Sequence, residues 1–155
     1  MTMRIAVLDD WQRAARQSAD WRPLMLRADV EFSGHLTKEA LVGVLQSARA
    51  VVVPSECNEN APLSLLEAYA TGRPVIGANI AGIPELIREE ETGVLFPTGN
   101  VDALAARLEN FAQLPDTRLA AMGNAGRRWV ERDFNPAIYR DRLLELYASI
   151  IGKAA

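Results

Sequence analysis

Short runs of apolar, β-branched residues alternate along the chain with longer stretches in which apolar side chains recur every three or four positions. Runs of the first kind are typical of buried strands, and the longer spacing is typical of amphipathic helices. The pattern predicts five strands, over residues 4–8, 30–32, 50–53, 74–77 and 93–96. Because strands and helices alternate, we expect a parallel sheet with right-handed crossovers.

Residues that start and end helices mark the segments between these strands. Pro62 suits the first position of a helix, where its missing N–H would have no partner, and Gly72 suits the far end of that helix. Asn100 can cap another helix with its side-chain oxygen. After residue 96 the pattern contains no further strand and predicts two helices, over 116–132 and 136–151.

Length, charge and cysteine content narrow the class of protein. With 155 residues the chain can bury a substantial core, so we expect a single α/β domain over residues 1–155. A net charge of −3 argues against a sequence-independent grip on nucleic acid. No apolar run reaches the ~18 residues of a membrane span, and the N-terminus lacks the layout of a secretion signal. The single cysteine, Cys57, excludes an internal disulfide and fits a reducing cytoplasm.

Two kinds of bound group are not expected. One histidine and one cysteine are too few for a zinc site made by this chain alone, so we predict no metal site. The chain contains neither Gly-x-Gly-x-x-Gly nor Gly-Lys-Ser/Thr, so we predict no dinucleotide or other cofactor.

The segment with the clearest chemistry is SECNENAPLSLLEAYATGRPVIG, residues 55–77. It begins where the third predicted strand ends and carries Glu59 and Glu67 on either side of the helix start at Pro62. Parallel α/β sheets bind ligands beyond the carboxyl ends of their strands. The free N–H groups and dipole of a helix start there suit a diphosphate.

From about residue 30 to 147 the chain resembles the C-terminal, donor-binding half of retaining GT-B glycosyltransferases, the glycogen-synthase-like and mannosyltransferase-like group. The resemblance rests on Glu-x7-Glu followed by Ala-x-Ala-x-Gly-x-Pro-Val-Ile and then Gly-Ile-Pro-Glu. Further matching segments, in order, are VEFSGHLTKEAL, ETGVLFPTGNVDALAARL, MGNAGRRWVERDF and YRDRLLELY. Many family members carry Gly where this chain has Pro62.

The resemblance implies roles for six residues. Glu59 would face the donor sugar as the catalytic carboxylate, the amides near Leu63 and Ser64 would hold phosphate, and Glu67 would bind the ribose hydroxyls. His35 would lie near the base pocket and Glu85 would contact the donor.

The roles of the four charged or titratable side chains each have a structural alternative. Glu59 would then be a solvated loop residue, and Glu67 a charge on a helix surface. His35 would be a turn histidine with a local hydrogen bond, and Glu85 a first-turn carboxylate favoured by the helix dipole.

The start of the chain departs from the family pattern. Family donor domains open with a strand and a glycine-arginine turn, followed by a lysine-glycine pair, and these cations neutralise the diphosphate. Here the segment MRIAVLDDWQRAARQSADWRPL instead resembles the first strand and helix of a D-2-hydroxyacid dehydrogenase. We therefore interpret residues 1–29 as a replacement βα unit on a donor-domain-like region over 30–150, in a chimeric or shortened chain.

This interpretation predicts the sheet. In the family order 3-2-1-4-5-6 the first strand is central, and its loss would leave a gap with many unpaired backbone groups. The strand over 4–8 can fill that gap, which predicts a Rossmann-like or flavodoxin-like three-layer domain with strand order 2-1-3-4-5 and two extra C-terminal helices. Asp9 and Asp10 would then lie beside the anion site and weaken it. A Mg²⁺ site at these two acids stays open as a minor alternative.

Three hypotheses of function follow. The first is a donor-binding domain for a nucleoside diphosphate sugar, weak at best and inactive without a partner that supplies the acceptor half. The second is a catalytically silent scaffold. The third is a small dehydrogenase or a receiver-like signalling module, which is weakened by the missing dinucleotide loop and by Val53-Pro54-Ser55 where a receiver carries Asp.

Overall fold

The computed structural model describes residues 3–8 and 13–152. The chain divides into two compact units, residues 1–44 and 45–155, and the division falls inside helix α3 (Lys38–Ser47). The two units are described separately.

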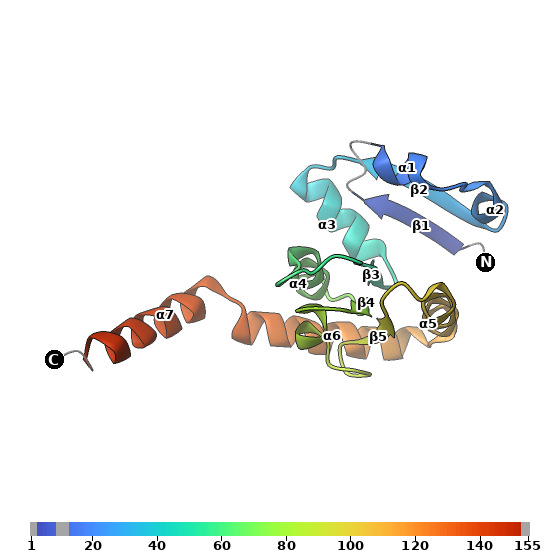
Figure 1. Cartoon of the computed structure of the whole chain (residues 1–155). Coiled ribbons are helices and arrows are strands. Elements are labelled where there is room, and N and C mark those ends of the chain that lie inside the picture. Colours follow the sequence, from blue (N-terminus) through green and yellow to red (C-terminus); the bar gives the residue numbers. More distant parts are fainter. Residues whose placement is uncertain (1–2, 9–12, 153–155) are drawn as a thin grey trace. The chain divides into compact units, whose positions relative to one another are not determined.

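The first unit contains a two-stranded parallel sheet (Figure 1), made of β1 (Met3–Leu8) and β2 (Ala28–Gly34). Ile5 lies opposite Val30, and the register shifts by one residue after Val7. Two short helices connect the strands, α1 (Ala14–Ser18) and α2 (Arg22–Met25). Trp21 packs edge-on against Phe32 with ring centroids 5.0 Å apart. This ring contact holds Trp21, the residue before α2, against β2.

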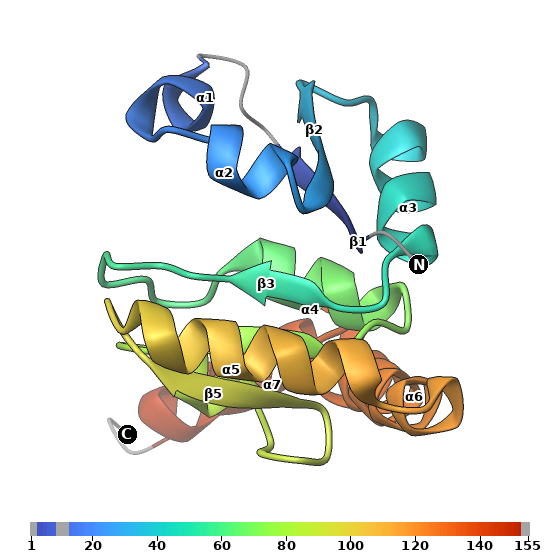
Figure 2. The same cartoon turned by 90° about the vertical axis from the view of Figure 1, so that its right-hand side faces the viewer.

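The second unit contains a three-stranded parallel sheet in the order β3-β4-β5 (Figure 1), of which β3 and β5 are labelled in the turned view of Figure 2. The strands are β3 (Val51–Val53), β4 (Val75–Asn79) and β5 (Gly93–Pro97). The other elements are α4 (Leu63–Ala70), the 3₁₀ helix η1 (Ile83–Leu86), α5 (Val101–Gln113), α6 (Asp116–Asp133) and α7 (Pro136–Ile151).

The predicted strand order 2-1-3-4-5 is wrong at one junction. Its pairs 2-1 and 3-4-5 are present, but within the described residues β1 does not pair with β3, so the strands form two sheets. Inside the first unit, Arg4 of β1 forms ion pairs with Asp29 and Glu31 on β2. The sequence pattern located the strands but did not specify this part of their order, because strand pairing depends on contacts between segments that are far apart in the chain.

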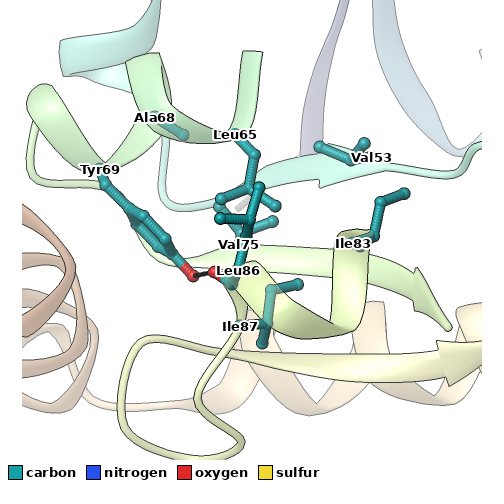
Figure 3. Packing of buried hydrophobic residues seen from close by; sticks show 8 residues of the cluster. All are labelled: Val53, Leu65, Ala68, Tyr69, Val75, Ile83, Leu86 and Ile87. Atoms are coloured by element: carbon teal, nitrogen blue, oxygen red, sulfur yellow. Dashed lines mark hydrogen bonds between the residues drawn. The ribbon is translucent and has the colours of Figure 1, made fainter. Parts of the chain in front are cut away.

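Strand β4 divides the core of the second unit into two clusters, because successive side chains point to opposite faces. Val75 belongs to the cluster that α4 and η1 cover (Figure 3). Ile76 and Ala78 belong to the opposite cluster, with Phe111 of α5 and Met122 of α6. Both faces of this sheet are therefore covered, as the predicted three-layer arrangement requires.

A buried hydroxyl network ties α4 to the segment after η1. The Tyr69 hydroxyl lies 3.0 Å from the Leu86 carbonyl oxygen, to which it donates (Figure 3), and 2.8 Å from Thr92 Oγ1. Thr92 Oγ1 in turn accepts from the backbone N–H of Arg88 at 3.0 Å. Burial raises the pKa of Tyr69 to about 12, although the hydrogen bond with Thr92 opposes the shift. The phenol is thus neutral, and every group in the network has a partner.

Two glycines of α6 let this helix approach α4 closely. A Cβ on Gly123 would lie 1.9 Å from the carbonyl oxygen of Gly72, and a Cβ on Gly126 would lie 2.4 Å from the Tyr69 ring. Side chains at either position would push the helices apart. Strand β4, η1 and α6 together therefore fix the position of α4.

Helix α7 begins after Asn135, whose side-chain oxygen accepts from the Ile138 amide at 3.0 Å. None of its described residues is buried. Six large apolar side chains on it are exposed, namely Tyr139, Leu144, Leu146, Tyr147, Ile150 and Ile151. Even so, no helix within residues 3–8 and 13–152 has the length and apolar character needed to span a bilayer.

Candidate functional site

The candidate site lies at the edge of the second sheet where β3, β4 and β5 end. Because the strands are parallel, the loops that follow them emerge on the same side. Two hydrogen bonds join these loops. The Gly82 N–H donates to the Glu59 carbonyl oxygen at 3.0 Å, and Thr98 Oγ1 donates to the Ser55 carbonyl oxygen at 3.2 Å. The loop after β3 is therefore held by the loops after both other strands.

Glu59 is a partly buried residue with defined contacts. Its carboxylate oxygen Oε1 accepts a hydrogen bond from Ser55 Oγ at 2.6 Å. This distance is within the normal range of an O–H···O hydrogen bond. Hydrogen bonds thus engage both the side chain and the backbone of Glu59.

Gly82 allows the turn after β4 to lie against this loop. A Cβ at this position would fall 1.8 Å from the carbonyl oxygen of Asn60. The neighbouring Ala81 adopts the left-handed conformation with φ 49°. Only a residue without a side chain fits at 82, so the glycine of Gly-Ile-Pro-Glu serves the packing of the loop that carries Glu59.

The start of α4 follows four residues after Glu59. Pro62 is buried and serves as the N-cap, with φ −65° and ψ 118°, one residue before the helical position that its sequence context predicts. No side chain caps the helix, and the Leu65 N–H donates to the Pro62 carbonyl oxygen at 3.1 Å. The amides of Leu63 and Ser64 are the first two of the helix and have no intrahelical acceptors. Both residues are exposed, so this helix start is open to an anion.

Glu67 lies one turn after Leu63 on the exposed side of α4. Within the described residues no hydrogen bond or ion pair engages its carboxylate. Glu85 is also exposed, in the first turn of η1. Both side chains can therefore meet a ligand, and the surface-charge alternative remains compatible with the same geometry.

The structure brings five of the six predicted residues into the second unit, namely Glu59, Leu63, Ser64, Glu67 and Glu85. His35 lies in the first unit, directly after β2, and is exposed. Asp9 and Asp10 lie outside the described residues. Their predicted effect on the anion site assumed the five-stranded sheet that the structure contradicts.

Three residues with a part in this arrangement were not predicted, namely Ser55, Gly82 and Thr98. Ser55 follows the third strand directly, and Gly82 begins a motif already noted in the sequence, so position offered a signal for both. Thr98 offered none, because its contact joins positions 43 residues apart.

The local charge is entirely negative. The segment 54–70 carries Glu56, Glu59 and Glu67 and contains no lysine or arginine. Among the described residues no cluster of three metal-ligating side chains occurs. Within this segment the attraction for an anion therefore rests on the start of α4.

Comparison with known proteins identifies the family. The family model of glycosyl transferases group 1 matches residues 4–129. A protein of Escherichia coli (strain K12) designated a colanic acid biosynthesis glycosyltransferase, WcaL, is 32% identical over 152 residues, which cover 95% of this chain and 37% of that protein. The D-inositol 3-phosphate glycosyltransferase of Saccharomonospora viridis is 36% identical over 107 residues, or 69% of this chain and 24% of that protein.

Solved structures agree on the fold. Sucrose-phosphate synthase from Thermosynechococcus elongatus matches 98% of this chain with a TM-score of 0.80 and 26% identity, over 39% of its own chain. HepE of Anabaena in complex with UDP-glucose matches 96% of this chain with a TM-score of 0.74 and 20% identity, over 41% of its own chain. The present chain thus spans less than half the length of these proteins.

The chain belongs to the glycosyl transferases group 1 family, and the predicted resemblance to the C-terminal domain of GT-B enzymes is confirmed. The family match starts at residue 4 and so includes the first strand. The interpretation of residues 1–29 as a dehydrogenase-like replacement is not confirmed.

Proposed function

We propose that this member of the group 1 glycosyl transferases binds the donor of the reaction, a nucleoside diphosphate sugar, at the edge formed by the ends of β3, β4 and β5. One observation carries the proposal. The fixed carboxylate of Glu59 and the uncapped start of α4 stand four residues apart at that edge. A carboxylate that meets sugar hydroxyls beside a helix start that meets phosphate matches the two halves of such a donor.

Each part of the donor then has a partner. Glu59 faces the sugar, the amides of Leu63 and Ser64 bind the diphosphate, and Glu67 accepts hydrogen bonds from the ribose hydroxyls. Glu85 lies after the neighbouring strand as a further contact. His35 belongs to the first unit and remains a proposed contact of the base.

The affinity should be low. An exposed helix start contributes roughly 0.3–1 kcal/mol toward an anion. Ribose hydrogen bonds contribute roughly 0.5–1.5 kcal/mol net each. The negative charges of the three acids in segment 54–70 repel the diphosphate, and no cation in that segment offsets them. We expect a Kd for a nucleoside diphosphate no tighter than about 1 mM, or about −4 kcal/mol.

Two further points support this class of ligand and limit the activity. HepE, which shares the fold, is known as a complex with UDP-glucose. The chain spans 37% of the length of WcaL, and sugar transfer requires donor and acceptor to be held together. We therefore propose that residues 1–155 alone do not transfer sugar and that an acceptor-binding partner completes the site.

We also propose a cytoplasmic setting, in which the exposed thiol of Cys57 stays reduced.

The test is a titration of the chain with UDP, GDP and ADP and with their glucose conjugates, followed by two-dimensional NMR. We expect millimolar binding, with the amide signals of Leu63 and Ser64 among those that shift. Absence of any shift at a ligand concentration about ten times the expected Kd of about 1 mM would favour the silent scaffold. The acidic segment 54–70 also favours that alternative. Turnover of a donor onto an added acceptor, if abolished in Glu59→Ala, would refute the proposed inactivity.

A further inference from the structure

We infer that Ser55 is a positioning residue that orients the Glu59 carboxylate for the donor sugar. The inference rests on the proposed function, since it assigns Glu59 to the sugar, and it adds a second residue through which the site would discriminate a nucleotide sugar from the bare nucleotide. Ser55 itself acts through Glu59 and is not assigned a contact with the ligand.

The contact is specific to one carboxylate oxygen. Ser55 Oγ donates to Glu59 Oε1 at 2.6 Å, and both residues are partly buried. Within the described residues no hydrogen bond or ion pair engages the other oxygen, Oε2. The side chain is therefore held at one oxygen and leaves the second for a hydroxyl donor on a ligand.

The backbone at both ends of this contact is anchored. The Ser55 carbonyl oxygen accepts from Thr98 Oγ1 at 3.2 Å. The Glu59 carbonyl oxygen accepts from the Gly82 N–H at 3.0 Å, and the close approach of Gly82 to Asn60 leaves no space for movement toward that turn. The backbone of Ser55 is bound by the loop after β5, and that of Glu59 by the loop after β4. The hydrogen bond between their side chains therefore joins two residues whose backbone positions are already defined.

This arrangement predicts an effect on the sugar and not on the nucleotide. A glutamate side chain that is ordered before binding loses little rotamer freedom when the ligand arrives. Removal of the Ser55 hydroxyl would leave the Glu59 side chain free to exchange between rotamers. Binding of the sugar would then have to order that side chain. The diphosphate binds at the start of α4, which is formed by backbone and does not depend on the Ser55 hydroxyl.

The experiment uses the full chain and four variants, Ser55→Ala, Ser55→Thr, Glu59→Ala and the combination of Ser55→Ala with Glu59→Ala. Ser149→Ala is the matched control, because that serine also donates a hydrogen bond but lies on α7. For each protein the Kd values of UDP-glucose and UDP are measured by NMR titration. The three-bond Hα–Hβ couplings of Glu59 are measured without ligand.

We expect Ser55→Ala to weaken UDP-glucose binding about three- to tenfold and to leave UDP binding within about twofold, which is the size expected for one hydrogen bond. Ser55→Thr, which keeps the hydroxyl, should restore the affinity. In the Glu59→Ala background, which has no side-chain acceptor for the Ser55 hydroxyl, Ser55→Ala should add less than about twofold. The Glu59 couplings should show one rotamer in the unmodified chain and an average in Ser55→Ala.

The results separate this inference from the proposed function. If the unmodified chain binds neither ligand, the proposed function fails, and the role of Ser55 toward the sugar fails with it even if the couplings show one rotamer. If the chain binds UDP-glucose but Ser55→Ala weakens UDP equally, Ser55 only stabilises the loop and the inference is overturned. Averaged Glu59 couplings in the unmodified chain would also overturn it.

Discussion

Replacing Tyr69 by Phe should show how much the buried hydroxyl network contributes to stability. The change removes the donor to the Leu86 carbonyl oxygen and the hydroxyl partner of Thr92 while keeping the ring that packs against Gly126. A buried polar group left without a partner costs roughly 1–3 kcal/mol. We therefore expect the free energy of unfolding at pH 7 to fall by roughly that amount.

The pH dependence gives the same variant a sharper test. Burial raises the pKa of Tyr69 from 10.0 to about 12, so between these values the folded state retains a proton that the unfolded state releases. Stability from this group is complete below pH 10 and is lost as the pH rises toward 12, at about 1.4 kcal/mol per pH unit. The advantage of the unmodified chain over Tyr69→Phe should therefore shrink above pH 10.

The assay is urea denaturation of both proteins at pH 7, 9, 10, 10.5 and 11, followed by circular dichroism. Comparison of the two proteins cancels the titration of other groups that behave alike in both. If the difference in unfolding free energy stays constant up to pH 11, the phenol is not desolvated in the way that its burial implies. If Tyr69→Phe equals the unmodified chain at pH 7, the network contributes nothing and the reasoning fails.

Three further predictions concern the site and α7. Gly82→Ala should destabilise the chain by roughly 1–3 kcal/mol in urea denaturation, because the new Cβ would meet the Asn60 carbonyl oxygen; an unchanged midpoint would contradict this. Ser64→Asp should weaken UDP binding at least about threefold in NMR titration, because a carboxylate would compete with phosphate at the start of α4; tighter binding would show that the anion binds elsewhere. Leu144→Gln on exposed α7 should change the unfolding free energy by less than about 0.5 kcal/mol, whereas Leu65→Ala in the core should cost roughly 2–5 kcal/mol; equal losses would show that α7 is packed.

Local pattern was sufficient to find the elements. The strand expected over 93–96 spans Gly93–Pro97, and the one expected over 4–8 spans Met3–Leu8. Asn100 caps α5 as expected, with its side-chain oxygen accepting from the Ala103 amide at 2.9 Å. These features depend on residues within a few positions of one another, so apolar spacing and capping chemistry carry enough information to predict them.

The candidate site was predictable in part. The Glu-x7-Glu spacing located Glu59 and Glu67 around the start of α4, because both belong to one short segment. The contact of Ser55 with Glu59 is local too, since the two residues are four positions apart. A loop segment of this kind has many conformations, and the two backbone anchors select the one that forms the contact. Gly82 lies beside this loop because β3 and β4 are neighbouring parallel strands whose ends meet at one edge of the sheet. No short-range sequence pattern encodes that contact.

The pairing of strands required the tertiary structure. The amino-acid sequence by itself determined that the strands are parallel and determined which residues of β4 face each side, because alternation and crossover geometry are local rules. It did not determine whether β1 joins β3, since that pairing depends on the free energy of contacts between distant segments. Among the described residues the structure has one sheet of β1 and β2 and another of β3, β4 and β5.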